Sequence, residues 1–191
     1  MVNSTQIESV DVLTEETEEA VLGGGCFWCT ESVLSTLRGV KGVTPGYAGG
    51  DLPNPTYEAV CEKNTGHIEV VRVVFNPAEI SYETLLTVFF ATHDPTTVNR
   101  QGNDVGPQYA SVIFYYSDEQ ERIAKRVMQE VENELGQAVV TQLRPKATFW
   151  PAEEVHHNYY ARNPMQGYCV FVISPKLSKL RSHFGNLLAT K

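Results

Sequence analysis

The chain has 191 residues, 42% of them hydrophobic and 20% charged, and its formal net charge is −8. That length suits one domain with its own core, and the composition is ordinary for a globular protein. No stretch approaches the roughly 20 apolar residues that span a bilayer. The chain does not begin with the layout of a signal peptide, and no basic patch could meet nucleic-acid phosphates. We therefore expect a cytoplasmic monomer that binds neither membrane nor nucleic acid.

The negative charge is concentrated at the start of the chain. Residues 1–19 hold six acidic residues and no Lys or Arg, which leaves a charge of −2 for residues 20–191. A short, highly charged segment has too little apolar surface to fold and is usually mobile. We expect an acidic leader over residues 1–19 and a single domain over residues 20–191.

The first predicted elements surround a run of glycines. Residues 20–22 form a short apolar strand that leads into the three glycines of residues 23–25. A helix follows, and its apolar face consists of Val33, Leu34 and Leu37. Glycines and prolines over residues 46–55 indicate an irregular loop, and residues 68–75 are a strongly apolar strand.

The sequence in the middle of the chain predicts two helices, each with a serine cap. Ser81 precedes a helix whose apolar residues are Leu85, Leu86, Phe89 and Phe90. Residues 93–108 contain two prolines, two glycines and many polar side chains, which predicts a long loop with a functional role. Residues 109–116 are the next strand. Ser117 then starts a capping box before a helix whose apolar stripe is Ile123, Val127 and Val131.

The last third of the chain supplies further strands. Residues 139–143 and 147–150 indicate short strands, residues 152–161 a last helix, and residues 170–173 an ordered strand. The order of strands and helices predicts an α+β fold, a two-layer sandwich with a ferredoxin-like core in which helices pack on a mixed sheet. The glycine-rich turn should place Cys26 at the edge of that sheet.

Cys26 stands where a thiol can ionise. It follows three glycines and starts the predicted helix, and the free N–H groups of a helix N-terminus favour negative charge. We therefore predict a lowered pKa for the Cys26 thiol, because the thiolate is the form that attacks as a nucleophile. The glycines leave the sulfur uncrowded, and Phe27 and Trp28 add aromatic surface beside it.

A turn, a phosphate loop, a zinc site and a thioredoxin-like site agree less well with this motif. A plain turn with a buried cysteine does not call for two aromatic residues in the motif, and a phosphate-binding loop would show a Lys or a Gly-x-Gly-x-x-Gly spacing. A structural zinc site needs two more ligands at close spacing, whereas Cys61 and Cys169 stand alone. A thioredoxin-like site has Trp before its first cysteine, but Trp28 lies between Cys26 and Cys29.

Six short motifs follow one another along the chain. They are Gly24-Gly25-Cys26-Phe27-Trp28, Gly46-Tyr47-Ala48-Gly49-Gly50, Pro55-Thr56-Tyr57-Glu58, Thr65-Gly66-His67-Ile68-Glu69-Val70, His93-Asp94-Pro95-Thr96 and Gly106-Pro107-Gln108-Tyr109. Their combination and order resemble the A-type peptide methionine sulfoxide reductases, over residues 20–170. The resemblance implies an enzyme that reduces methionine S-sulfoxide, protein-bound or free, and so repairs oxidative damage.

The resemblance implies three proton donors for the sulfoxide oxygen, namely Glu69, Tyr57 and Tyr109. The chemistry is suitable, because this oxygen is a poor leaving group that needs a proton as a thiolate attacks the sulfur. Glu69 has apolar neighbours in its predicted strand. Burial raises the pKa of a carboxyl, so Glu69 can stay protonated at neutral pH and donate.

The resemblance also implies a pocket for the methionine methyl group. Phe27 and Trp28 would form its apolar wall, and Asp104, in the long loop, would help to shape it. Asp104 could instead form an Asx turn with its neighbour. We expect His67 to be structural, and His156 to be structural or to support the residues that touch substrate.

The catalytic cycle needs a second thiol. Once Cys26 is a sulfenic acid, a second cysteine would form an intramolecular disulfide with it, and thioredoxin or a similar dithiol would reduce that disulfide. In the family this cysteine often follows Asn-Pro-x-Gly-Tyr, as Cys169 does here with one extra residue. Cys29, one helical turn from Cys26, can reach it without loop motion. Both remain candidates, with Cys61, which we expect to be buried and inert, or an external thiol behind them. No cofactor or metal is implied.

Two other functions fit parts of the sequence. A general dithiol–disulfide oxidoreductase would use Cys26 and Cys29 and would have no need of Glu69. A metal-binding or scaffold domain would use none of these residues as catalysts. The six motifs favour the reductase.

Overall fold

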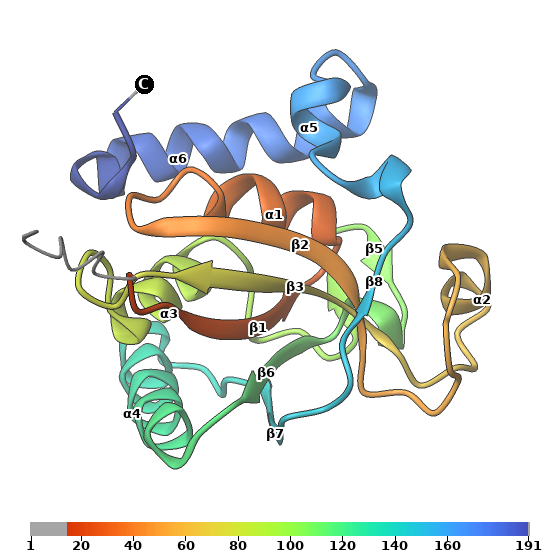
Figure 1. Ribbon diagram of the computed structural model, residues 1–191, viewed down its shortest axis with the longest axis horizontal. Coiled ribbons are helices and arrows are strands. Elements are labelled where there is room, and N and C mark those ends of the chain that lie inside the picture. Colours follow the sequence, from red (N-terminus) through yellow and green to blue (C-terminus); the bar gives the residue numbers. More distant parts are fainter. Residues whose placement is uncertain (1–14, 191) are drawn as a thin grey trace, which may run out of the picture.

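The structure is a computed structural model that describes residues 15–190, so most of the predicted leader lies outside the described residues. Its centre is a six-stranded sheet in the order β7-β6-β1-β3-β2-β8, accompanied by a two-stranded ribbon of β4 and β5 (Figure 1). Neighbouring strands of the sheet are antiparallel, except β6 and β7, which are parallel. The mixed sheet with helices packed on it confirms the predicted α+β sandwich.

The strands are β1 (Glu18–Gly24), β2 (Val40–Ala48), β3 (Ile68–Phe75), β4 (Arg100–Gln101), β5 (Asp104–Val105), β6 (Ser111–Tyr115), β7 (Gln142–Pro145) and β8 (Trp150–Pro151). The α-helices are α1 (Phe27–Leu34), α2 (Tyr57–Cys61), α3 (Tyr82–Ala91), α4 (Asp118–Leu135), α5 (Tyr159–Arg162) and α6 (Ser174–Phe184). A π-helical turn, Cys169–Ile173, leads directly into α6. In Figure 1, α6 runs alongside α1, whereas α2 stands apart from the other helices.

Side chains alternate between the two faces of the sheet, as strand geometry requires. In β1, Leu22 belongs to the core under the helices, and Val21 belongs to the cluster on the opposite face. In β3, Val71 and Val73 lie in the core under the helices, and Glu69 shares their parity. Strand register therefore places the carboxyl of Glu69 on the face against which α1 packs.

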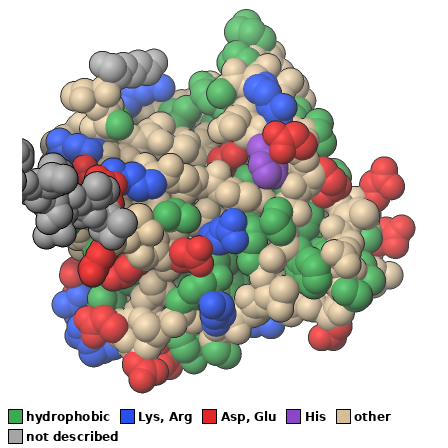
Figure 2. All heavy atoms as spheres, in the orientation of Figure 1, with side chains coloured by type: hydrophobic (Ala, Val, Ile, Leu, Met, Phe, Trp, Pro, Cys, Tyr) green, Lys and Arg blue, Asp and Glu red, His purple; other side chains and the backbone are tan. Residues whose placement is uncertain are grey.

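The opposite face of the sheet is covered by the segment before β8. Phe149 packs there, and the Arg72 guanidinium lies 4.8 Å from the centroid of its ring. On the side of the molecule in Figure 2, acidic and basic side chains are interspersed. Within residues 15–190, no helix combines the length and the apolar character needed to cross a membrane.

Several predicted elements are present. The strand predicted over residues 68–75 is β3, with the same bounds. The strand predicted over residues 20–22 is longer than expected, because β1 also takes in Glu18 and Glu19 from the predicted leader and the first two glycines. The Ser81 hydroxyl accepts a hydrogen bond from an N–H in the first turn of α3, and the Ser117 hydroxyl does so in α4. These caps satisfy N–H groups that have no partner within the helix, and so fix where α3 and α4 begin.

Residues 46–48 are strand, which corrects the prediction of a loop from residue 46. They form the end of β2, where Gly46 pairs with Val70 on one side and with Pro151 on the other. A Cβ on Gly46 would come within 2.4 Å of the Trp150 carbonyl oxygen. The glycine that resembled a loop signal is needed because two strands approach it closely.

Two predictions near the C-terminus are wrong. Residues 152–161 do not form one helix, because Asn158 adopts a left-handed conformation (φ 52°) between the 3-10 turn Glu154–His156 and α5. Residues 170–173 are helical rather than extended, and Ile173 is fully buried there. Short apolar runs are ambiguous between strand and helix, and here packing of α6 on α1 decides for the helix.

Other boundaries shift by a few residues. The strand predicted over residues 109–116 starts only at Ser111, because Tyr109 closes a 3-10 turn. The strands predicted over residues 139–143 and 147–150 reduce to β7 and β8. The predicted long loop contains the β4–β5 ribbon, whose register pairs Gln101 with Asp104.

Candidate functional site

Cys26 lies between the end of β1 and the start of α1. Gly25 precedes it with φ +95°, and a Cβ on Gly25 would come within 2.6 Å of the Gln101 side chain, so the turn requires glycine. Cys26 is the N-cap of α1, and its carbonyl accepts a hydrogen bond from the Cys29 N–H at 3.1 Å. β1 is an inner strand of the sheet. Cys26 therefore lies at the end of an inner strand, whereas the prediction placed it at the edge of the sheet.

The two cysteines of the motif form a hydrogen-bonded pair and are only 8% and 3% exposed. Burial, this hydrogen bond and the charge of Glu69 raise the pKa of Cys26, which corrects the prediction of a lowered value. The pKa of Cys29 is lowered to about 7, first by the hydrogen bond from Cys26 and further by the positive charge of Lys176. Desolvation thus outweighs the helix N-terminus at Cys26, and the pair ionises more readily at Cys29.

Glu69 lies close to Cys26 and is 1% exposed. Its Oε2 accepts a hydrogen bond from the Phe27 N–H at 3.0 Å, and within residues 15–190 its Oε1 makes no hydrogen bond. Burial raises the pKa of Glu69 to about 8, and the charges of Asp104 and Cys29 add to that shift. The carboxyl is therefore mostly protonated at neutral pH and holds a proton that it can donate.

Tyr57 and Tyr109 accompany this carboxyl. Both are half-buried, and burial together with the charge of Glu69 raises the pKa of each phenol, so both stay protonated. The Cys61 thiol contacts the Tyr57 hydroxyl. Cys61 is half-buried rather than buried, and burial raises its pKa. Three groups that can donate protons thus lie together, as the resemblance implied.

Phe27 and Trp28 differ in exposure, which changes the predicted pocket wall. Phe27 is 1% exposed, because its ring packs in the core against Tyr47 and His156, with centroids 5.7 and 5.3 Å away. Trp28 is only partly buried and stacks on Tyr159, with centroids 3.8 Å apart and an interplanar angle of 5°. Trp28 is therefore the more accessible of the two aromatic residues, and Phe27 contributes its backbone N–H to the site.

Hydrogen bonds tie α1 to the segment that follows β8. Trp28 Nε1 donates to His156 Nδ1 at 3.2 Å, and Glu31 Oε1 accepts from the N–H of Asn158 at 2.8 Å. The first contact gives His156 the supporting role that the sequence indicated. Glu31 and Tyr159 had no sequence signal of their own, because their partners lie more than 120 residues away in the chain.

Tyr168 connects the long loop to the cysteine pair. Its hydroxyl donates to Asp104 Oδ2 at 2.6 Å and lies 3.5 Å from Cys29 Sγ. Asp104 is thus held in β5 close to the cysteines, and its predicted role in shaping the pocket stays a prediction. Cys169 is fully buried, and the Cys29 thiol is the cysteine whose charge acts on it. Cys29 therefore interacts directly with Cys26, and its charge also reaches Cys169.

Two histidines near the site are structural. His67 accepts a hydrogen bond from the Gly50 N–H at 3.1 Å, and its other ring nitrogen bonds a backbone carbonyl. His93 Nδ1 donates to the Phe89 carbonyl at 2.6 Å, and its Nε2 lies 2.8 Å from the Ser111 hydroxyl. Burial lowers the pKa of His93 to about 4, so it stays neutral.

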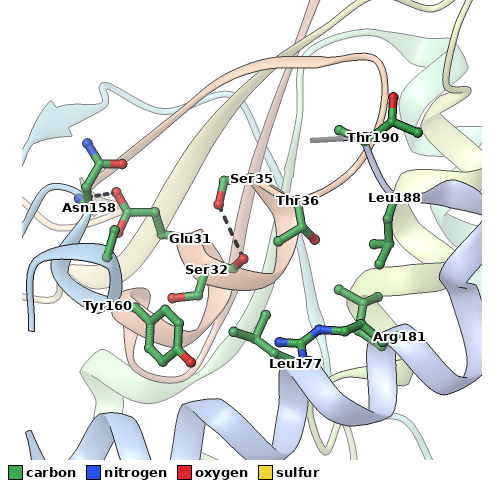
Figure 3. Close-up of a pocket in the computed structure, with 13 residues that line it drawn as sticks. Glu31, Ser32, Ser35, Thr36, Asn158, Tyr160, Leu177, Arg181, Leu188 and Thr190 are labelled. Atoms are coloured by element: carbon green, nitrogen blue, oxygen red, sulfur yellow. Dashed lines mark hydrogen bonds between the residues drawn. The ribbon is translucent and has the colours of Figure 1, made fainter. Parts of the chain in front are cut away.

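A groove of about 740 Å³ lies away from the cysteines, between α1, α6 and the C-terminal residues (Figure 3). Two of the hydroxyl groups that line it are bonded to the backbone of α1. The Ser35 hydroxyl donates to the Ser32 carbonyl, and the Thr36 hydroxyl donates to the Val33 carbonyl. No cysteine lines this groove, so it is not the site of thiol chemistry.

The site combines a thiol pair, a protonated carboxyl and two phenols at the start of one helix. Within residues 15–190, no three His, Cys, Asp or Glu side chains are grouped as a metal ion would require. This arrangement defines a thiol-dependent oxidoreductase, in which one sulfur attacks the substrate while acids protonate the atom that leaves.

Comparison with known proteins identifies the family. A family model described as peptide methionine sulfoxide reductase matches residues 18–188. The peptide methionine sulfoxide reductase MsrA of Deinococcus radiodurans is 53% identical over 173 residues, which cover 90% of this chain and 84% of the relative. The chain belongs to the peptide methionine sulfoxide reductase family and is an oxidoreductase.

Solved structures agree with this assignment. The reduced form of Mxr1 from Saccharomyces cerevisiae has a TM-score of 0.75 and 32% identity, covering 85% of this chain and 94% of that one. Methionine sulfoxide reductase A of Corynebacterium diphtheriae has a TM-score of 0.72 and 36% identity, covering 81% of this chain and 78% of that one. Mxr1 has also been solved in complex with Trx2, at a TM-score of 0.53 and 22% identity over 80% of this chain and 91% of that one.

Proposed function

We propose that this chain reduces methionine S-sulfoxide, free or in proteins, to methionine, with Cys26 as the nucleophile. One observation carries the proposal. The hydrogen bond from the Phe27 N–H holds the buried carboxyl of Glu69 next to the attacking sulfur, and this carboxyl keeps its proton at neutral pH. A dithiol oxidoreductase acting on disulfides would have no use for such an acid, whereas a sulfoxide oxygen needs one.

The first step transfers an oxygen atom. The Cys26 sulfur attacks the sulfoxide sulfur while Glu69, assisted by Tyr57 and Tyr109, protonates the sulfoxide oxygen. The sulfur–oxygen bond of the substrate then breaks, and the oxygen ends on Cys26 as a sulfenic acid. The substrate gains two electrons and Cys26 loses two. The thiol proton of Cys26 ends on the sulfenic acid, so no proton is consumed overall.

The substrate methyl group rests on the ring of Trp28 in this proposal. Tyr159 stacks behind that ring and the Asp104–Tyr168 hydrogen bond closes the site beside it. An apolar face next to a few fixed polar groups is the usual composition of a small-molecule site.

We assign the resolving role to Cys29. Its sulfur is already hydrogen-bonded to that of Cys26, and its pKa of about 7 supplies thiolate at neutral pH. Attack of Cys29 on the sulfenic acid forms the Cys26–Cys29 disulfide and releases the oxygen as water. Cys169, which is fully buried and within range of the charge of Cys29, can then take over the disulfide by exchange with Cys29, which frees Cys26.

A thioredoxin-type dithiol would close the cycle by reducing this disulfide. The proposal fits a protein that works in the cytoplasm, where such reductants keep thiols reduced.

The function is tested by one turnover without reductant. The reduced protein is mixed with an excess of the S or the R epimer of N-acetyl methionine sulfoxide, and the thioether formed is quantified. We expect about one thioether per chain from the S epimer and none from the R epimer, since the family reduces one sulfoxide epimer. No thioether from either epimer would refute the function, and equal yields would refute the stereochemical assignment.

The same reaction tests the resolver. Peptide mapping after the first turnover should give a Cys26–Cys29 link, with a Cys29–Cys169 link appearing later. Cys29→Ser should keep the first thioether but accumulate a sulfenic acid that dimedone traps. Its steady-state turnover should fall about 100-fold, because an intramolecular partner at high effective concentration is lost. If Cys169→Ser rather than Cys29→Ser accumulates the sulfenic acid, Cys169 is the resolver.

A further inference from the structure

Lys176 is the charged residue of α6 that lies nearest the reaction centre. It lines a small cavity together with Cys29 and His93, beneath the surface of the molecule. It also lines a shallow pocket open to solvent with His93 and Asp94. The half-buried side chain of Lys176 therefore lies between the cysteine and the solvent.

Lys176 has no counter-ion within residues 15–190. No carboxylate oxygen there lies within 4.0 Å of its Nζ, and it donates no hydrogen bond. Lys179, one turn further along α6, instead donates to the Ala91 carbonyl at 2.9 Å. A half-buried ammonium without a carboxylate partner is costly unless something in its surroundings benefits from the charge.

The charges around Cys29 show that its thiolate is the group that the Lys176 ammonium can stabilise. Negative charge comes from Asp104 on β5 and from Glu69 on β3 when it is ionised, and the Tyr168 hydroxyl and the Cys169 thiol are neutral. His93 is neutral as well. Among the described groups, Lys176 is the cation that acts most strongly on the Cys29 sulfur.

The positive charge of Lys176 is most important at the step in which Cys29 attacks the sulfenic acid. In the resting enzyme the strongest stabilisation of a Cys29 thiolate is the hydrogen bond from the Cys26 thiol. That donor disappears when Cys26 becomes a sulfenic acid, which is when Cys29 must attack. The Tyr168 hydroxyl, 3.5 Å from the sulfur, gives a smaller stabilisation than Lys176, and it donates its hydrogen to Asp104 Oδ2 at 2.6 Å.

We propose that Lys176 is an electrostatic positioning residue for Cys29, whose ammonium group holds the attacking thiolate at the step that forms the disulfide. This role rests on the proposed function, in which Cys29 is the resolving cysteine. It predicts that Lys176 affects disulfide formation and has no part in the reduction of the sulfoxide.

The test compares Lys176→Met with Lys176→Arg, and with Lys179→Met as the matched control on the same helix. Single-turnover mixing of each reduced protein with N-acetyl methionine S-sulfoxide gives two rates, thioether formation and loss of the dimedone-reactive sulfenic acid. For Lys176→Met, thioether formation should match the wild type. Loss of the sulfenic acid should slow at least about threefold at pH 6.5, because the thiolate fraction of Cys29 falls. The difference should vanish at high pH, where Cys29 is ionised in either protein, and Lys176→Arg and Lys179→Met should behave as wild type.

Labelling of Cys29 in a Cys26→Ser background separates this proposal from the function itself. The pH dependence of iodoacetamide labelling, followed on the Cys29 peptide, reports the thiolate whether or not sulfoxide is a substrate. Lys176→Met should shift the midpoint of labelling to higher pH. A midpoint of labelling that does not shift would overturn the proposal. So would a slower disappearance of the sulfenic acid that does not depend on pH, or one that is equally slow in Lys176→Arg. Absence of thioether in the wild type would instead contradict the proposed function.

Discussion

Cys26→Ala is expected to abolish reduction of methionine S-sulfoxide, lowering kcat by roughly 10⁴-fold or more. The reason is that the other thiol of the pair, Cys29, is less accessible to a substrate. Cys29 lies deeper, at 3% exposure, and faces Cys26, Tyr168 and Lys176. Thioether production under saturating dithiothreitol gives the rate, and dithiothreitol removes any dependence on the natural reductant.

Cys26→Ser serves as the close control for this variant. A hydroxyl fills nearly the same volume and can keep a hydrogen bond to Cys29, so folding should be unchanged while activity is still lost. Thermal unfolding of both variants should match that of the wild type. Retention of more than a few per cent of the activity in either variant would remove Cys26 from the nucleophile role.

Glu69→Gln should lower the rate of thioether formation by about 10²- to 10⁴-fold, the range that a positioned general acid contributes. The amide can still accept the Phe27 N–H, so the geometry at the start of α1 should persist. It cannot transfer a proton to the leaving oxygen. Single-turnover rates over a pH series measure the effect, because they isolate the chemical step from reduction of the disulfide.

The pH profile identifies the acid. Burial raises the pKa of Glu69 to about 8, so the donating form is present below pH 8 and is lost as the pH rises through that value. The wild-type rate should therefore fall above about pH 8, and this limb should be missing in Glu69→Gln. An unchanged alkaline limb in Glu69→Gln would assign it to another group.

Stability gives an independent control for the same variant. Because the folded-state pKa of Glu69 is raised, its neutral form stabilises the fold at low pH, and this contribution is lost as the pH rises through about 8. Gln has no charge to bury. Glu69→Gln should therefore gain thermal stability relative to the wild type on going from pH 6 to pH 9, while its activity stays low. Loss of activity together with loss of stability at both pH values would indicate damage to the fold instead.

Short sequence patterns predicted the features of the fold that depend only on residues close together in the chain. The glycines before Cys26 fixed the turn from strand to helix, and the serine caps marked the starts of α3 and α4. The alternation of β3 placed Glu69 among apolar residues, and burial of a carboxyl raises its pKa wherever the burial comes from. These signals are local because hydrogen bonding in a cap and alternation in a strand act over a few residues.

Contacts between distant segments decided the rest. Helix-start geometry favours a thiolate at Cys26, yet burial against the sheet and the bond to Cys29 moved the lower pKa to Cys29. Apolar residues 170–173 became helix because α6 packs on α1, and this brought Tyr168 and Lys176 to the cysteines. Charge and burial at a site are sums over all the atoms nearby. The sequence could therefore locate the pair of thiols, and only the tertiary structure decides which of the two is ionised.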